Sequence, residues 1–160
     1  MRRFEPVAAV GGVLLLVSLF LPWYGVDLPA SIGDASPFGP AEASGWQILT
    51  VIDVLLALIA LPAIALPIVS ITAEGPAKPI AVAVIASATG WLAVVLVAFR
   101  LLDAPGDVDE FLGPRYGIWL ALAGALIAWI GSWLTMRDES TPGAVAPDIQ
   151  RRPAPPTRAA

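Results

Sequence analysis

The sequence predicts an all-α fold, a four-helix transmembrane bundle with up-down topology. Three observations support this fold class: the apolar composition, four long apolar runs, and the placement of basic residues between those runs. Of the 160 residues, 58% are hydrophobic and only 14% are charged, and the mean hydropathy is +0.80. A soluble domain carries about 25% charged residues. The composition therefore indicates a protein of the lipid bilayer.

Each apolar run is long enough for a helix that crosses a bilayer, which needs about 20 apolar residues. The predicted spans cover residues from about 6–24, 46–72, 79–102 and 116–136. The first run has an alternative interpretation, because MRR followed by an apolar stretch is also typical of a secretory signal peptide. We favour a retained span, since this stretch is longer than a usual signal core and ends in LPWY without a clear cleavage site.

Basic residues predict the orientation of the spans. Lysine or arginine occurs in the N-terminal segment, in the connection between the second and third spans, and in the C-terminal tail. The first connection (26–45) has no basic residue, and in the third (103–115) acidic residues outnumber a single arginine. The positive-inside rule then places both termini in the cytoplasm of a multi-pass plasma-membrane protein. The Pro-, Ala- and Arg-rich segment 137–160 is predicted to be a disordered cytoplasmic tail after a membrane domain of residues 1–136.

Small residues mark the faces on which the helices are expected to pack, because close approach of the backbones holds helices together in lipid. In the fourth span such residues recur every three or four positions, at Gly117, Ala121, Gly124, Ala128 and Gly131. The third span has a shorter stripe that includes Gly90 and continues to Arg100. Both stripes predict helix–helix contacts.

Asp53 is the one carboxylate in the otherwise apolar stretch QILTVIDVLLALIA (47–60). It shares a helical face with Thr50 and two alanines, so we expect it to meet another helix rather than lipid. A lone aspartate at the bilayer centre costs about 2.5–3.5 kcal/mol. Arg100 lies at the same end of the next antiparallel span, and we predict an Asp53–Arg100 interaction, direct or through water, that offsets part of this cost. Asp53 is then either part of a structural clamp or a proton or cation site.

Trp23 and Trp46 are predicted to lie at the membrane interface, where tryptophan accumulates. They belong to LPWY at the end of the first span and SGW at the start of the second, and VIDVLLAL and AFRLL follow in the second and third spans. In this combination the chain resembles a family of small, uncharacterised bacterial four-helix integral membrane proteins over residues 1–139. The resemblance implies the four-span fold and points to Trp23, Trp46, Asp53 and Arg100, and it implies no activity.

The residue types present leave little room for enzyme chemistry. The chain has no cysteine and no histidine, which removes thiolate nucleophiles, imidazole metal sites and Ser-His-Asp arrangements. It carries no nucleotide-binding, zincin or EF-hand motif. The net charge of −4 argues against nucleic acid as a partner. We therefore expect no enzyme activity, no catalytic, cofactor-binding or metal-binding residues, and the lipid bilayer as the surroundings.

Two functions remain open at this point. The first is a structural or accessory membrane protein that acts through helix packing, in a homo-oligomer or with a larger membrane-protein partner. The small-residue stripes and the absence of catalytic residue types favour it. The alternative is a small proton- or cation-coupled transporter or channel subunit that uses Asp53. An intramembrane enzyme has the least support, since one carboxylate supplies neither a metal site nor a nucleophile–base pair.

Overall fold

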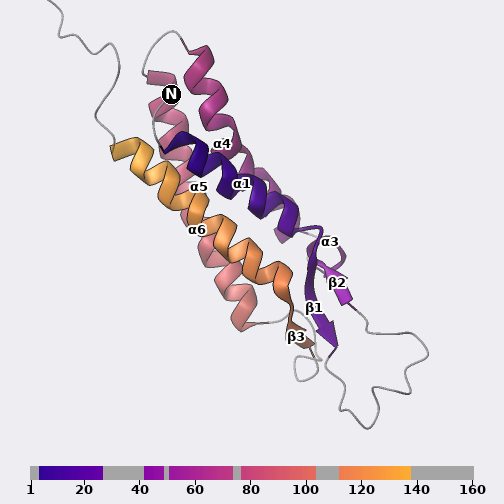
Figure 1. Ribbon diagram of the computed structural model, residues 1–160. Helices are drawn as coiled ribbons and strands as arrows, with labels where there is room; N and C mark the ends of the chain where they lie inside the picture. Colours follow the sequence, from indigo (N-terminus) through magenta and orange to yellow (C-terminus); the bar gives the residue numbers. More distant parts are fainter. Residues whose placement is uncertain (1–3, 27–41, 49–50, 74–76, 104–111, 138–160) are drawn as a thin grey trace, which may run out of the picture.

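The computed structural model describes residues 4–26, 42–48, 51–73, 77–103 and 112–137. Most of them are helical, and the helices are α1 (Glu5–Ser18), α3 (Gly45–Ile48), α4 (Ile52–Thr72), α5 (Ala77–Leu102) and α6 (Tyr116–Arg137) (Figure 1). Three short strands occur among the described residues: β1 (Pro22–Val26), β2 (Glu42–Ser44) and β3 (Leu112–Pro114). The predicted all-α class is confirmed, and a small sheet that the sequence did not predict is added to it.

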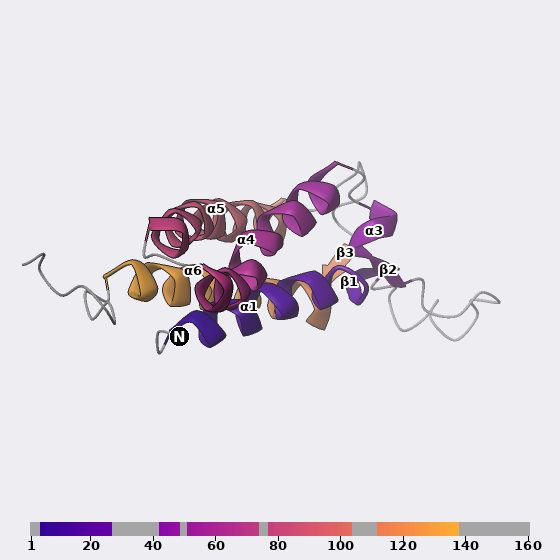
Figure 2. The ribbon, with the colours of Figure 1, turned by 90° about the horizontal axis from the view of Figure 1, so that it is seen from above.

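The four longer helices lie side by side, and each packs against two others. α1 packs against α4 and α6, and α5 packs against the same two helices (Figure 2). α4, α5 and α6 contain segments long and apolar enough to cross a membrane, whereas α1 is apolar but has only 14 residues. The structure is therefore compatible with a membrane protein. The four spans and their orientation stay predictions, and the predicted tail after Arg137 lies outside the described residues.

Two helices are shorter than the apolar runs that predicted them. α1 ends at Ser18, although the first apolar run continues to about residue 24. Pro22 explains the early end, because proline has no N–H for a helical hydrogen bond and disfavours helical backbone at the preceding residue. α4 begins at Ile52, and Trp46 lies on the separate short helix α3. Asp53 consequently stands in the first turn of α4.

The small sheet lies at one end of the helices, which we call the sheet-bearing end (Figure 1). β1 is the central strand and pairs antiparallel with β2 on one side and with β3 on the other. The register places Tyr24 opposite Ala43 and Pro114. Trp23 and Tyr24 of β1 are buried in the same core cluster as residues of the helices. The sheet thus closes the helical core at this end.

The predicted stripe on α6 meets α1 at very short range. A Cβ atom on Gly124 would lie 2.6 Å from the backbone nitrogen of Leu15, and one on Gly131 would lie 2.6 Å from that of Ala8. Real Cβ atoms do not approach backbone so closely, so the two helices can adopt this separation only because both α6 positions are glycine. Small residues allow the same close approach in membrane helices.

The other predicted packing residues also face neighbours within the chain. Gly117 faces the carbonyl of Pro22 in β1, and Gly90 of α5 faces the backbone of Trp129 in α6. The three remaining α6 positions of the stripe are all buried: Gly117, Ala121 and Ala128. The stripe is therefore occupied inside the chain and does not present a free surface to a partner.

We expect Gly124→Ala to destabilise the protein by about 1–3 kcal/mol, the usual cost of overpacking. Alanine is the better helix former, but its Cβ would press on the α1 backbone, which cannot yield locally. The measurement is unfolding in detergent, by heat or denaturant. Gly25→Ala is the control, because the three atoms nearest to its Cβ all belong to a flexible arginine side chain, that of Arg115, rather than to backbone. Equal losses of stability in the two variants would contradict this account of the α1–α6 contact.

Candidate functional site at the end of helix α1

One face of the C-terminal end of α1 is buried in the protein, where its backbone carbonyls need donors. The last four carbonyls of a helix have no partner within the helix. In α1 the hydroxyl of Ser18 donates to the Leu15 carbonyl at 2.6 Å, and the backbone N–H of Phe20 donates to the Val17 carbonyl at 3.1 Å. Ser18 and Leu15 are both fully buried. The helix therefore ends in a hydrogen-bonded turn inside the core.

Trp23 supplies a cap from outside the helix. Its indole Nε1–H donates to the Ser18 carbonyl at 2.7 Å, and the same carbonyl accepts the backbone N–H of Leu21 at 3.1 Å. Trp23 is fully buried, so its side chain does not contact lipid, as an interfacial residue would. The hydrogen bond allows this burial, because a buried indole N–H without an acceptor would cost about 1–3 kcal/mol. The Trp23 carbonyl in turn accepts the N–H of Arg115 at 2.8 Å, which joins β1 to the start of α6.

The short helix α3 is attached to the same end of α1. The backbone N–H of Trp46 donates to the Leu19 carbonyl at 3.4 Å. The Trp46 side chain is 38% exposed and lies against Phe20, with 5.7 Å between the ring centroids. Trp46 is thus placed on the surface, where the predicted interfacial role needs it.

Asp53 lies next to α3, close to Gly45. Its carboxylate is fully buried, and a Cβ atom on Gly45 would be 3.4 Å from Asp53 Oδ1 and 3.1 Å from the Leu19 carbonyl oxygen. Gly45 therefore lies within van der Waals range of the carboxylate, and its lack of a side chain matters most for the tighter approach to the Leu19 carbonyl. A negative charge in the first turn of α4 is also favoured by the helix dipole. The structure brings Asp53 to the junction of α1, α3 and α4.

Arg100 lies at the sheet-bearing end, in the last turn of α5. Its backbone carbonyl accepts the hydroxyl of Tyr24, which links β1 to α5. Its guanidinium carbon is 5.7 Å from the centre of the Phe99 ring, and its Nε atom is buried. The structure therefore places Arg100 and Asp53 at the same end of the helices. Their interaction stays a prediction.

Sequence reasoning missed a second buried carboxylate, Glu5, at the opposite end of the helices. Glu5 is fully buried in the first turn of α1 and accepts a hydrogen bond from the Ser70 hydroxyl of α4 at 2.8 Å. Its position among the first basic residues and before Pro6 resembles an exposed helix start, which concealed its role. A signal was present in Ser70, a polar residue at the far end of an apolar helix from Asp53. Glu5 thus joins α1 to α4.

The two buried carboxylates are far apart. Asp53 and Ser70 are 17 positions apart on α4, or about 26 Å at 1.5 Å per residue. The buried face of α4 between them is apolar and comprises Leu56, Ile59, Ala60, Ala63 and Leu66. The polar groups on the inner face of α4 therefore lie near its two ends, and apolar side chains fill the space between them.

Within the described residues, no group of three or more acidic side chains is arranged to hold a metal ion. No protein-family model, curated protein or solved structure matches the chain. The fold and the junction at the end of α1 define the class of protein: a helical protein with three helices able to cross a membrane and a small sheet that closes one end. The resemblance to a bacterial membrane-protein family stays a prediction.

We expect Trp23→Phe to lower the free energy of unfolding by about 0.5–1.5 kcal/mol, the net contribution of one hydrogen bond, because it keeps an aromatic ring but removes one of the two donors to the Ser18 carbonyl. Unfolding in detergent measures the loss. Trp119→Phe is the matched control, since Trp119 is 53% exposed on α6 and should change stability by less than about 0.5 kcal/mol. A Trp23→Phe variant as stable as the parent would show that the indole does not cap α1.

Proposed function

We propose that the chain is a multi-pass integral membrane protein with a structural or accessory role, four spans and both termini in the cytoplasm. Three apolar helices of sufficient length support the membrane location. The distribution of basic residues supports the orientation. The fourth crossing consists of α1 and the residues that follow it.

The observation that carries the structural role is the placement of the buried polar groups. Three of their described hydrogen bonds join different elements, and all three lie at an end of the helices. The Trp23 indole ties β1 to α1, the Tyr24 hydroxyl ties β1 to α5, and the Ser70 hydroxyl ties α4 to Glu5 of α1. Such groups hold one arrangement of the helices together, because leaving them unpaired in an apolar interior is costly. A structural role is sufficient to explain these three contacts.

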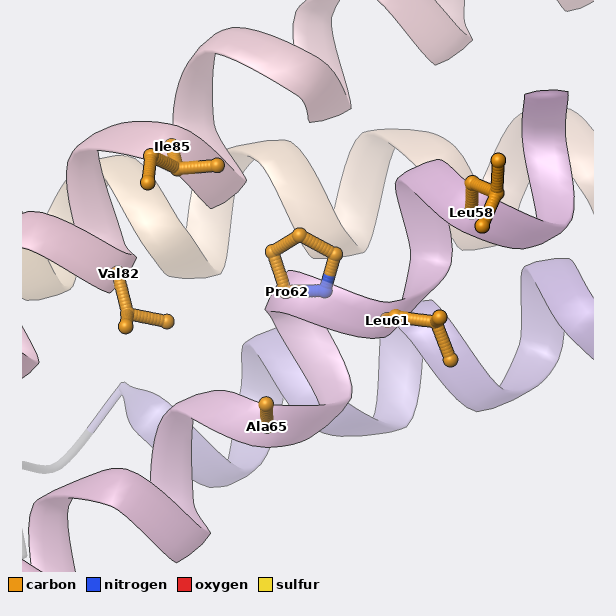
Figure 3. A pocket seen from close by; sticks show the side chains of 6 residues that line it. All are labelled: Leu58, Leu61, Pro62, Ala65, Val82 and Ile85. Carbon is orange, nitrogen blue, oxygen red and sulfur yellow. The ribbon is translucent and has the colours of Figure 1, made fainter.

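The role also requires association with copies of the chain or with a larger membrane protein. The α6 stripe is occupied by α1 and β1, so a partner has to use another face. The α4–α5 side offers a groove of about 380 Å³ lined by apolar side chains of both helices: Leu58, Leu61, Pro62, Ala65, Val82 and Ile85 (Figure 3). In the bilayer this groove takes either lipid or the side chains of a neighbouring helix, and we assign it to the neighbour.

In lipid nanodiscs or mild detergent, we expect the protein at a multiple of its 16.6 kDa mass or together with a co-purified membrane protein. Ala65→Trp fills the α4–α5 groove and should reduce the associated fraction. Ala123→Trp on the exposed face of α6 is the control and should leave it unchanged. Native mass spectrometry measures both. A lone monomer in nanodiscs, without a partner, would contradict the accessory role.

A second function, binding of a proton or cation at Asp53, is favoured by one observation. The Asp53 carboxylate and the Leu19 carbonyl oxygen both border Gly45 at the C-terminal end of α1. The C-terminal end of a helix carries a partial negative charge, and interrupted membrane helices use such ends to bind cations. The same junction therefore combines two sources of negative potential.

If Asp53 carries ions, proton or sodium flux into proteoliposomes should occur and be abolished by Asp53→Asn. Glu42→Gln is the matched control, because Glu42 is an exposed carboxylate at the same end of the protein. Under the structural role, by contrast, we expect no flux above that of empty liposomes. Flux that persists in Asp53→Asn would exclude this residue as the ion site.

A further inference from the structure

The outward face of α1 is an apolar stripe that continues past the end of the helix. Its exposed members follow one another at helical spacing: Val10, Val13, Val17 and Phe20. Phe20 lies after the last helical residue and contacts Trp46 of α3. The stripe therefore leads from the middle of α1 onto the sheet-bearing end.

α1 is too short to cross a bilayer by itself. Its 14 residues span about 21 Å at 1.5 Å per residue, whereas the hydrocarbon core is about 30 Å thick. The missing length has to come from the residues after Ser18. The backbone there is turn and strand, which membranes tolerate where it is covered by protein. β1 meets this condition, since Trp23 and Tyr24 are buried, Tyr24 is paired on both sides in the sheet, and the Trp23 carbonyl accepts the N–H of Arg115.

Phe20 and Trp46 lie against each other after the end of α1, and Val51 is exposed at the start of α4 at the same end of the helices. We call these three residues the aromatic patch. Phe20 is 67% exposed and Val51 is 77% exposed, and the rings of Phe20 and Trp46 are tilted by 47° with 5.7 Å between their centroids.

Polarity changes in one direction along this side of the molecule. Val17 of α1 is apolar, the aromatic patch follows, and the exposed polar groups of β2 and α3 come next. Among these, the Gln47 side-chain oxygen accepts the backbone N–H of Ser44 at 3.0 Å. The order from aliphatic to aromatic to polar matches the order of acyl chains, interface and headgroups in a bilayer leaflet.

Exposed aromatic side chains surround the rest of the sheet-bearing end. Phe99 in the last turns of α5, and Tyr116 and Trp119 in the first turn of α6, are each more than half exposed. Hydrogen bonds hold these helix ends at the level of β1, through the Arg100 carbonyl and the Arg115 N–H. The aromatic patch thus continues a ring that marks one level along the helices.

We propose that the aromatic patch binds the interfacial layer of the bilayer, between the acyl chains and the headgroups, and so completes the first crossing that α1 leaves short. This rests on the proposed membrane location. The bound partner is phospholipid: the rings lie among the upper acyl carbons, and the indole of Trp46 lies at the level of the ester and phosphate groups, as is usual for interfacial tryptophan. The sheet then sits within the headgroup layer rather than far out in water.

The absence of native cysteine allows a direct test. Single cysteines replace Val13, Phe20, Trp46, Val51 or Gln47, all exposed positions, and each carries a spin label in phosphatidylcholine–phosphatidylglycerol liposomes. Collision with oxygen reports lipid, and collision with a water-soluble nickel chelate reports water. We expect Val13 to be the deepest site and Gln47 to be in water. Phe20, Trp46 and Val51 should be intermediate, with nickel accessibility several-fold below that of Gln47.

The outcomes separate this proposal from the membrane location itself. Suppose that Val13 is in lipid but that nickel reaches Phe20, Trp46 and Val51 as readily as Gln47. This result would overturn the proposed binding of the aromatic patch to lipid and leave the membrane location intact. Shielding of these three sites from both oxygen and nickel would also overturn it, because protein rather than lipid would then cover the patch. Water access at Val13 would contradict the proposed membrane location. If Trp46→Cys fails to fold, Phe20 and Val51 decide the result, since both side chains point outward.

Discussion

The capping of the α1 carbonyls is the interaction on which the rest of the sheet-bearing end depends. A helix that ends inside an apolar core must find donors for its last carbonyls, because neither water nor lipid supplies them there. Local donors meet part of this need, and the indole of Trp23 and the backbone N–H of Trp46 add donors from other elements. The first donor fixes β1 against α1, and the second fixes α3. With α3 in this position, Gly45 lies next to the carboxylate of Asp53.

Close packing of helix backbones is a second constraint on the structure. Glycines of α6 let its backbone approach α1, and Gly117 lets the start of α6 approach β1. The sheet and the α1–α6 contact therefore belong to one rigid interface. Buried polar groups then join the helices at both ends, with an apolar layer between them. This arrangement supports a structural role, and the proposed alternative, ion binding, would occur beside Asp53.

The sequence predicted the helices better than their ends. The apolar runs predicted α4, α5 and α6, because apolar residues are favoured both in a protein core and in the hydrocarbon layer of a bilayer. The sheet escaped prediction, since its strands have three to five residues and pair across long stretches of chain. The pattern LPWY is compatible with Trp23 at a lipid interface and with Trp23 as a buried donor to the end of a helix. Only the hydrogen bond from the Trp23 indole to the Ser18 carbonyl, seen in the structure, distinguishes the two. Glu5 was missed because an acid at a helix start is usually exposed, and its partner Ser70 lies 65 residues away.

Hydrogen exchange of the tryptophan indoles tests the capping of α1 most directly. Nuclear magnetic resonance of the nitrogen-15-labelled protein in detergent resolves each indole N–H. The Trp23 signal should exchange with deuterium far more slowly than that of the exposed Trp119, because its N–H is bonded to the buried Ser18 carbonyl. Exchange at Trp23 as fast as at Trp119 would contradict the capping of α1 by the Trp23 indole. It would also remove the physical cause proposed for the position of the sheet and α3 against α1, and for the burial of Asp53.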